Sequence, residues 1–224
     1  MKYLITTRSD KSIKWLSDIT HPPLKEYAKF CNADFMVLDH EPPVRSWDGH
    51  PHHRIMKHYE LHEEYDRILH LDTDIIVNKN VPNIFEYVPY EKIGSVLEDT
   101  GREERIKDRK QSMKEIQDAW GDIGWTKNYI QTGVFLTSKM HRDIYQPFEG
   151  KYWTLTCSDD VHLSYMIKYL NHEIFELPYQ FNHTGTYSEP WNSSANRLDS
   201  YFLHYSGGEA IKKELLRDFK KIYG

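Results

Sequence analysis

The sequence is poor in cysteine, with only Cys31 and Cys157 in 224 residues. Two cysteines make neither a disulfide framework nor a cysteine-rich metal knuckle, and their scarcity fits a reducing compartment. Long apolar runs are also missing. The first ten residues, MKYLITTRSD, are too short an apolar run for a signal peptide or an anchor. No other stretch approaches the roughly 18 apolar residues of a membrane-spanning helix, so we expect a cytoplasmic protein with no membrane-spanning segment.

An excess of positive charge is absent as well, because 29 Lys and Arg stand against 34 Asp and Glu, a formal net charge of -5. No basic tail or stripe stands out, which argues against nucleic acid as a partner. The apolar share of 39% and the aromatic share of 14% predict a packed globule rather than a disordered chain. We find no internal repeat and no interdomain linker. The sequence therefore predicts one domain over residues 1–224.

Apolar strand-like segments alternate with helical segments along the chain. Strands are expected at residues 2–7, 34–39, 67–71, 93–97, 134–137, 174–177 and 201–205. Helices are expected at 11–19, 24–31, 54–64, 161–170 and 209–223, with Pro22 and Pro23 separating the first two. The charge-dense run 101–110 is expected to be a solvated loop or helix face. This alternation predicts an α/β/α sandwich with a mostly parallel central sheet.

Polar residues follow three of the expected strands. In mainly parallel sheets, ligands bind beyond the carboxyl ends of the strands. Thr7, Asp39 and Asp72 stand at such ends. We therefore expect them at one rim of the sheet.

The segment RILHLDTDIIV carries two carboxylates, Asp72 and Asp74, at the end of an apolar strand. Aspartate pairs are common on surfaces, where a solvated turn is the ordinary explanation. Here apolar residues flank the pair on both sides, and two buried carboxylates without a cation would repel each other. Mg²⁺ and Mn²⁺ prefer oxygen ligands and leave positions for substrate phosphates. The pattern favours a divalent-metal site.

Four segments, in this order, resemble a known family: LITTRSD, YDRILHLDTDIIVNKNVPNIFE, YIQTGVFL and YFLHYSGG. They are similar to segments of the retaining GT-A glycosyltransferases related to glycogenin and to bacterial lipopolysaccharide galactosyltransferases, that is, glycosyltransferase family 8. Together they span nearly the whole chain. The resemblance implies a GT-A nucleotide-diphospho-sugar transferase domain. Such an enzyme moves a hexose-type sugar from a nucleotide-sugar donor, with UDP as the expected nucleotide, to a glycan or other hydroxyl acceptor, with retention.

The resemblance also implies a ligand set for the metal. Asp72, Asp74 and His204 would bind Mn²⁺ or Mg²⁺, and Asp72 would also contact the donor. Neutral imidazole is a sound ligand for transition metals, although any one of the 13 histidines is more often structural. Thr7 and Arg8, at the end of the first strand, would contact the nucleotide.

Two further positions of the donor site follow from the same resemblance. Gly207 would let the backbone approach the diphosphate, although an ordinary strand-to-helix turn explains the glycine equally well. The family places a cationic residue before the Asp-x-Asp strand, where it would stabilise the departing diphosphate. Here Lys57 and Arg54 are available, and Lys57 fits the spacing better. A solvated helix face is the alternative for both.

The sugar-binding positions implied by the resemblance depart in part from the family pattern. A carboxylate after the strand at 93–97 would hold sugar hydroxyls, and we favour Asp99 over Glu98. Gln131 and Thr132 replace an Asn-Ser pair and could still bond to a sugar. The resemblance also implies three catalytic residues: Lys57 beside the departing diphosphate, and Asp159 and Asp160 near the reactive sugar carbon. Asp160 stands where the family often has Gln.

Other interpretations remain open. A phosphatase of the haloacid-dehalogenase type also has Asp-x-Asp after an apolar strand, but its motif usually stands near the N-terminus. A nucleotide-sugar or metal-binding module without turnover is a second alternative. Asp159 and Asp160 could simply fill the first turn of a helix after Ser158.

The sequence says less about the acceptor. Candidate contacts are Trp125, Trp191 and His183. Asn182 opens an Asn-x-Thr triplet, which without a secretory signal is a chance match to a glycosylation pattern.

Overall fold

The computed structural model describes residues 1–99, 103–184, 195–206 and 212–224. Within these residues the strands form two sheets. The larger has six strands in the order β2-β1-β3-β6-β5-β7. Their bounds are β1 Tyr3–Arg8, β2 Ala33–Leu38, β3 Arg67–Leu71, β5 Ile93–Leu97, β6 Ile130–Ser138 and β7 Ile174–Glu176. Strand β6 runs antiparallel to both of its neighbours, and the remaining pairs are parallel. The expected mostly parallel sheet is confirmed.

A smaller sheet pairs one strand from the first half of the chain with two late strands. It contains β4 Ile75–Val77, β8 His183–Thr184 and β9 Phe202–His204, in the order β4-β9-β8. Strand β9 pairs antiparallel with β4 and parallel with β8. Because β4 follows β3 after three residues, the Asp-x-Asp turn is the link between the two sheets.

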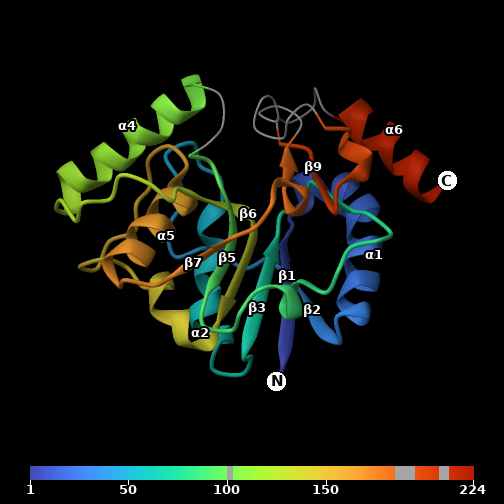
Figure 1. Cartoon of the computed structure of the whole chain (residues 1–224), viewed down its shortest axis with the longest axis horizontal. Coiled ribbons are helices and arrows are strands. Elements are labelled where there is room, and N and C mark those ends of the chain that lie inside the picture. Colours follow the sequence, from blue (N-terminus) through green and yellow to red (C-terminus); the bar gives the residue numbers. More distant parts are fainter. Residues whose placement is uncertain (100–102, 185–194, 207–211) are drawn as a thin grey trace.

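Helices cover both sides of the central sheet (Figure 1). Their bounds are α1 Lys14–Phe30, α2 His58–Leu61, α3 Ile84–Tyr87, α4 Glu103–Trp120, α5 Ser158–Tyr169 and α6 Lys212–Tyr223. Short 3-10 helices lie at Lys11–Ile13, His52–Lys57, Lys139–Tyr145, Tyr179–Phe181 and Arg197–Asp199. Helices α1 and α6 lie on one side, and α4 and α5 lie on the other. None of the helices among the described residues combines the length and apolar character needed to cross a bilayer.

The expectation of two helices separated by prolines was wrong, because α1 runs straight through Pro22 and Pro23. A proline inside a helix removes a hydrogen bond and costs about 3 kcal/mol. The buried residues Leu16, Thr20 and Leu24 recur at helical spacing, so one continuous face packs against the sheet strands. This packing offsets the cost of the prolines. The expected helix at 54–64 is instead a 3-10 turn followed by the short α2.

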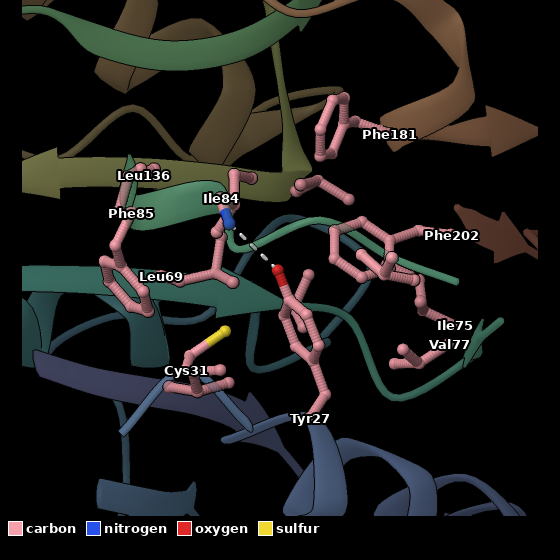
Figure 2. Close-up of a cluster of buried hydrophobic side chains, with 14 of the residues drawn as sticks. Tyr27, Cys31, Leu69, Ile75, Val77, Ile84, Phe85, Leu136, Phe181 and Phe202 are labelled. Carbon is pink, nitrogen blue, oxygen red and sulfur yellow. Dashed lines mark hydrogen bonds between the residues drawn. The ribbon is translucent and has the colours of Figure 1, made fainter. Parts of the chain in front are cut away.

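Strand β3 is buried along its whole length, as expected for a central strand covered on both faces. Leu69 lies in a core cluster with Ile84 and Phe85 of α3 (Figure 2). Leu71 belongs to the same cluster. Within this cluster the Tyr27 hydroxyl accepts a hydrogen bond from the backbone N–H of Ile84, at 3.1 Å. It also donates to the carbonyl of Pro82, at 2.8 Å. Helix α1 is thereby fastened to the start of α3, just after the small-sheet strand β4.

We expect Tyr27→Phe to lower the free energy of unfolding by about 1–3 kcal/mol, because the buried N–H of Ile84 and the partly buried carbonyl of Pro82 lose their partner. Urea denaturation followed by circular dichroism measures the loss. The control is Tyr3→Phe, since within the described residues the hydrogen bond of the Tyr3 hydroxyl is an exposed contact, 3.7 Å from the sulfur of Met1. Equal stability of the Tyr27 variant and the wild type would contradict this account of the core.

Candidate functional site

Three backbone hydrogen bonds fix the conformation of the turn at residues 72–74. The N–H of Asp72 donates to the carbonyl of Gly133 at 2.9 Å, and the N–H of Ile75 donates back to the Asp72 carbonyl at 3.2 Å. The N–H of Tyr205, just after β9, donates to the Asp74 carbonyl at 2.9 Å. Strands β6 and β9 therefore fix the direction in which both carboxylates point.

Asp72, Asp74 and His204 converge on one point. Each offers a ligand atom, and these atoms lie within 4.8 Å of one another. The His204 Nε2 atom is 3.2 Å from Asp74 Oδ1 and 3.8 Å from Asp72 Oδ2. Two carboxylate oxygens and one imidazole nitrogen form a donor set suited to Mn²⁺. The three residues singled out as metal ligands are thus brought together, although they come from distant parts of the sequence.

The charge balance of this cluster also fits a cation. Burial would lower the pKa of His204, but the carboxylates of Asp74 and Asp72 raise it above its ordinary value. The imidazole therefore tends to hold a proton between the two carboxylates. A divalent cation with the same ligands would replace that proton and supply more positive charge.

Gly133, on β6, leaves the space in which the His204 ring lies. A Cβ atom at this position would lie 2.6 Å from His204 Cε1 and 2.9 Å from its Nδ1. It would also lie 3.2 Å from Asp72 Oδ2. The His204 ring is buried and cannot give way, so the absence of a side chain at 133 is what lets β6 pass so close to the ligands.

Arg8, at the end of β1, joins the cluster to the start of α5. Its guanidinium donates to Asp72 Oδ1, to Asp159 Oδ2 at 3.2 Å and to the carbonyl of His52 at 3.0 Å. Burial would raise the pKa of Asp72, but Arg8 holds it well below its usual value. Asp72 is therefore ionised, as a metal ligand must be.

The expected rim of the sheet is also present. Thr7 lies on β1 with its hydroxyl oxygen 3.5 Å from that of Thr73 in the Asp-x-Asp turn. The Thr73 hydroxyl in turn donates to the Arg8 carbonyl. Asp39 is exposed just beyond β2, which runs parallel to β1, so it stands at the same edge.

Asp159 and Asp160 open α5 beside Thr132. The backbone N–H of Thr132 donates to Asp160 Oδ1 at 2.8 Å, and its hydroxyl lies 2.7 Å from that atom and 3.1 Å from Asp159 Oδ2. Burial and the neighbouring charge of Asp159 raise the pKa of Asp160 to about 7. Burial would raise the pKa of Asp159 too, but His52 and Arg8 lower it. The pair therefore combines one ionised carboxylate with one that holds a proton near neutral pH.

Glu98 lies deeper in the site than Asp99, the carboxylate that sequence reasoning favoured. Glu98 is 5% exposed and is held by Arg105, at 2.9 Å, and by Arg109. The amide of Gln131 donates to it at 3.0 Å. Asp99 instead accepts backbone N–H bonds from Asn128 and Tyr129.

The charge-dense segment therefore carries more than a solvated face. Arg105 and Arg109 belong to α4, and Arg109 is 3% exposed. Its guanidinium also donates to the sulfur of Cys157 at 2.8 Å. No sequence pattern distinguished these two arginines from the exposed charges around them.

The two cations expected on the helix before β3 have other partners. Arg54 donates to the carbonyls of His40 and Ser9, at 2.8 and 3.0 Å. Lys57 pairs with the exposed Glu60. Among the described residues, none of these contacts reaches the carboxylate cluster, and the guanidinium that does so is that of Arg8.

The remaining predicted site residues divide into two groups. Gly207 and Trp191 lie outside the described residues. Trp125 and His183, the other candidate acceptor contacts, are each 2% exposed, and His183 Nδ1 lies 2.7 Å from the Ser200 hydroxyl. Neither offers a surface to an acceptor in this structure.

The chain belongs to glycosyl transferase family 8, whose sequence pattern matches residues 4–210. It is thus a glycosyltransferase, as the resemblance implied, rather than a phosphatase. The comparison with curated proteins gives no match.

Solved structures share the fold across nearly the whole chain. A glycosyltransferase involved in the glycosylation of the major capsid of PBCV-1 is 14% identical, with 99% of this chain and 98% of that chain covered and a TM-score of 0.61. The galactosyltransferase LgtC, in complex with donor and acceptor sugar analogues, is 12% identical, with 99% and 96% covered and a TM-score of 0.60. A Drosophila β1,4-galactosyltransferase 7 variant, in complex with manganese, UDP-Gal and xylobiose, is 12% identical, with 95% and 74% covered and a TM-score of 0.52. At these identities the likeness shows the fold alone, which is GT-A.

The raised pKa of Asp160 gives a testable pH dependence. The pKa of Asp160 is about 7 in the folded protein and about 4 in the unfolded chain. Between pH 4 and pH 7 the folded state therefore binds more protons than the unfolded state, so the free energy of unfolding falls as the pH rises. Asp160→Asn cannot ionise. As the pH rises from 5 to 8, the free energy of unfolding of the variant should therefore increase by about 1–3 kcal/mol relative to that of the wild type. Urea denaturation with a chelator present measures this difference.

Asp159→Asn serves as the matched comparison. The pKa of Asp159 is lowered in the folded state, so its ionised form stabilises the protein above the usual pKa and that contribution disappears in the variant. The two variants should therefore depart from the wild type in opposite directions at pH 8. Identical pH profiles for both would overturn the assignment of the proton.

Proposed function

We propose that this glycosyltransferase is metal-dependent and transfers a hexose-type sugar from a nucleotide-sugar donor, UDP-linked, to a hydroxyl of a glycan or other acceptor, with retention. The observation that carries the proposal is the convergence of Asp72, Asp74 and His204 within 4.8 Å. The cation expected there is Mn²⁺ or Mg²⁺, which would neutralise charge on the donor diphosphate.

The residues around the ligands have separable roles in this proposal. Asp72, Asp74 and His204 hold the cation, and the end of β1 at Thr7 receives the nucleotide. Arg8 supplies the protein's own positive charge beside the developing phosphate charge, the role that the resemblance gave to Lys57. Its guanidinium is pinned by Asp72 and Asp159, so it is already oriented before a donor arrives.

The start of α5 orients the transferred sugar. Asp159, ionised and bonded to Arg8, accepts hydrogen bonds from sugar hydroxyls. Asp160 carries a proton near neutral pH and can both donate and accept. Thr132 lies between the two carboxylates and fixes their spacing.

Retention removes the need for a carboxylate base on the far face of the sugar. An inverting enzyme requires such a base opposite the leaving group. In a front-side reaction the departing phosphate oxygen can take the acceptor proton, so the Asp159–Asp160 pair is free to position the sugar and to stabilise positive charge near the anomeric carbon.

We expect Asp74→Ala to abolish Mn²⁺-dependent binding of UDP, because the variant loses one of only two charged ligands and a neutral water does not replace its charge. Isothermal calorimetry with Mn²⁺ and UDP measures this. Asp118→Ala is the control, since Asp118 is an exposed carboxylate on α4 that pairs only with Lys114 among the contacts described. His204→Ala should weaken binding less completely, because water can replace one neutral ligand. Unchanged UDP affinity in the Asp74 variant would rule out this site.

The anomeric configuration of the product is a separate test. An α-linked donor should give an α-linked product, as read by NMR. Asp159→Ala should lose most of the rate, whereas Asp160→Asn keeps polarity and shape and should lose only part of it. A β-linked product would reject retention and make one of these two carboxylates the general base.

A further inference from the structure

A chain of buried side chains runs from His204 away from the metal cluster. His204 Nδ1 lies 2.8 Å from Asn182 Oδ1, and the Asn182 amide nitrogen bonds to Gln131 Oε1. Gln131 Nε2 lies 3.0 Å from Glu98 Oε1. The chain ends at Glu98, which accepts hydrogen bonds from the guanidinium groups of Arg105 and Arg109. All four residues from His204 to Glu98 are at most 7% exposed.

The ionised end of this chain fixes the direction of every hydrogen bond in it. Burial would raise the pKa of Glu98, but Arg109 and Arg105 lower it, so the carboxylate is charged and can only accept. Gln131 must therefore turn its NH₂ group toward Glu98 and its oxygen toward Asn182. Asn182 must then turn its NH₂ group toward Gln131 and its oxygen toward His204. An amide oxygen only accepts, so His204 must carry its hydrogen on Nδ1.

The consequence reaches the ligand atom itself. A neutral imidazole with hydrogen on Nδ1 has a free lone pair on Nε2, the atom that faces Asp72 and Asp74. The opposite tautomer would point a hydrogen at the cation. The alternating oxygens and NH₂ groups thus select the tautomer that can bind metal.

We propose that Asn182, Gln131 and Glu98 form a tautomer-selecting relay that holds His204 with its hydrogen on Nδ1, so that Asn182 and Gln131 are positioning residues for a metal ligand. The inference rests on the proposed metal site for its functional meaning. Without a metal, the protonated imidazole described above carries hydrogen on both nitrogens. Once it is neutral, the relay keeps the one remaining hydrogen on Nδ1, so the tautomer can be read in the metal-free protein at alkaline pH. In the relay both the oxygen and the NH₂ group of Gln131 are hydrogen-bonded. The relay also accounts for the burial of Asn182, the first residue of the Asn-x-Thr triplet.

The sharpest test substitutes Gln131, which does not touch the histidine. Gln131→Met keeps length and volume but removes both polar groups, so Asn182 loses the bond that sets its orientation. The metal-free protein is labelled with ¹⁵N-histidine and studied by NMR at alkaline pH, where imidazoles are neutral. His204 is assigned by the signal missing in His204→Gln. We expect Nδ1–H alone in the wild type and a shift toward Nε2–H in Gln131→Met.

Metal affinity provides the second readout. Outer partners of metal-binding histidines typically contribute 10- to 100-fold in affinity. We expect Gln131→Met to weaken Mn²⁺ binding in the presence of UDP by roughly tenfold, and Asn182→Leu by more. Asn78→Leu is the matched control. It removes a half-buried amide that bonds the carbonyls of Leu198 and Ser200 near the same small sheet, away from the relay. It should change neither the tautomer nor the affinity.

The possible outcomes separate the two proposals. A wild-type His204 that carries its hydrogen on Nε2, or a Gln131→Met protein with unchanged tautomer and affinity, overturns the relay. An Nδ1–H tautomer that responds to Gln131→Met, in a protein that binds no Mn²⁺, supports the relay and rejects the metal site.

Discussion

Two carboxylates two residues apart, partly withdrawn from water, require positive charge beside them, and the arrangement of the site follows from that requirement. Asp72 and Asp74 lie in the only three residues that separate β3 of the large sheet from β4 of the small one. Positive charge reaches them from both sheets, as Arg8 from the end of β1 and as His204 from β9. Because Gly133 has no side chain, the imidazole of His204 can lie close to β6. Each of these residues would be poorly placed if the two carboxylates did not need to be compensated.

The sequence was most informative where one strand is buried on both faces. The mainly apolar β3 and the polar turn after it predicted both the strand and its chemistry, because apolar residues flank the two carboxylates on both sides. The mostly parallel sheet followed from the alternation of strands and helices. The prolines of α1 misled the prediction, since local propensity suggested a break and tertiary packing of one continuous apolar face prevailed.

The parts of the site that sequence reasoning missed are side chains whose roles depend on partners far along the chain. Arg8 was named only as a residue near the nucleotide, whereas the structure makes it the bridge between Asp72 and Asp159. Sequence reasoning favoured Asp99 over Glu98 because the sequence at a strand end does not show which of two adjacent acids turns inward. That choice is made by Arg105 and Arg109 on α4, within a segment whose composition reads as solvent-exposed. Distances of this kind are set by the fold and leave no local pattern.

The pairing of β4 with β9 has a consequence for the order in which the site is assembled during synthesis. A ribosome adds residues at about 5–20 per second, and early parts of a chain begin to fold before later ones exist. Asp72 and Asp74 therefore emerge with β3 well before His204, which follows Asp74 by about 130 residues. At that rate the nascent chain carries the two acids without the imidazole for roughly 10 seconds. Of the two positive partners of these acids in the folded protein, Arg8 has already been made during this interval and His204 has not.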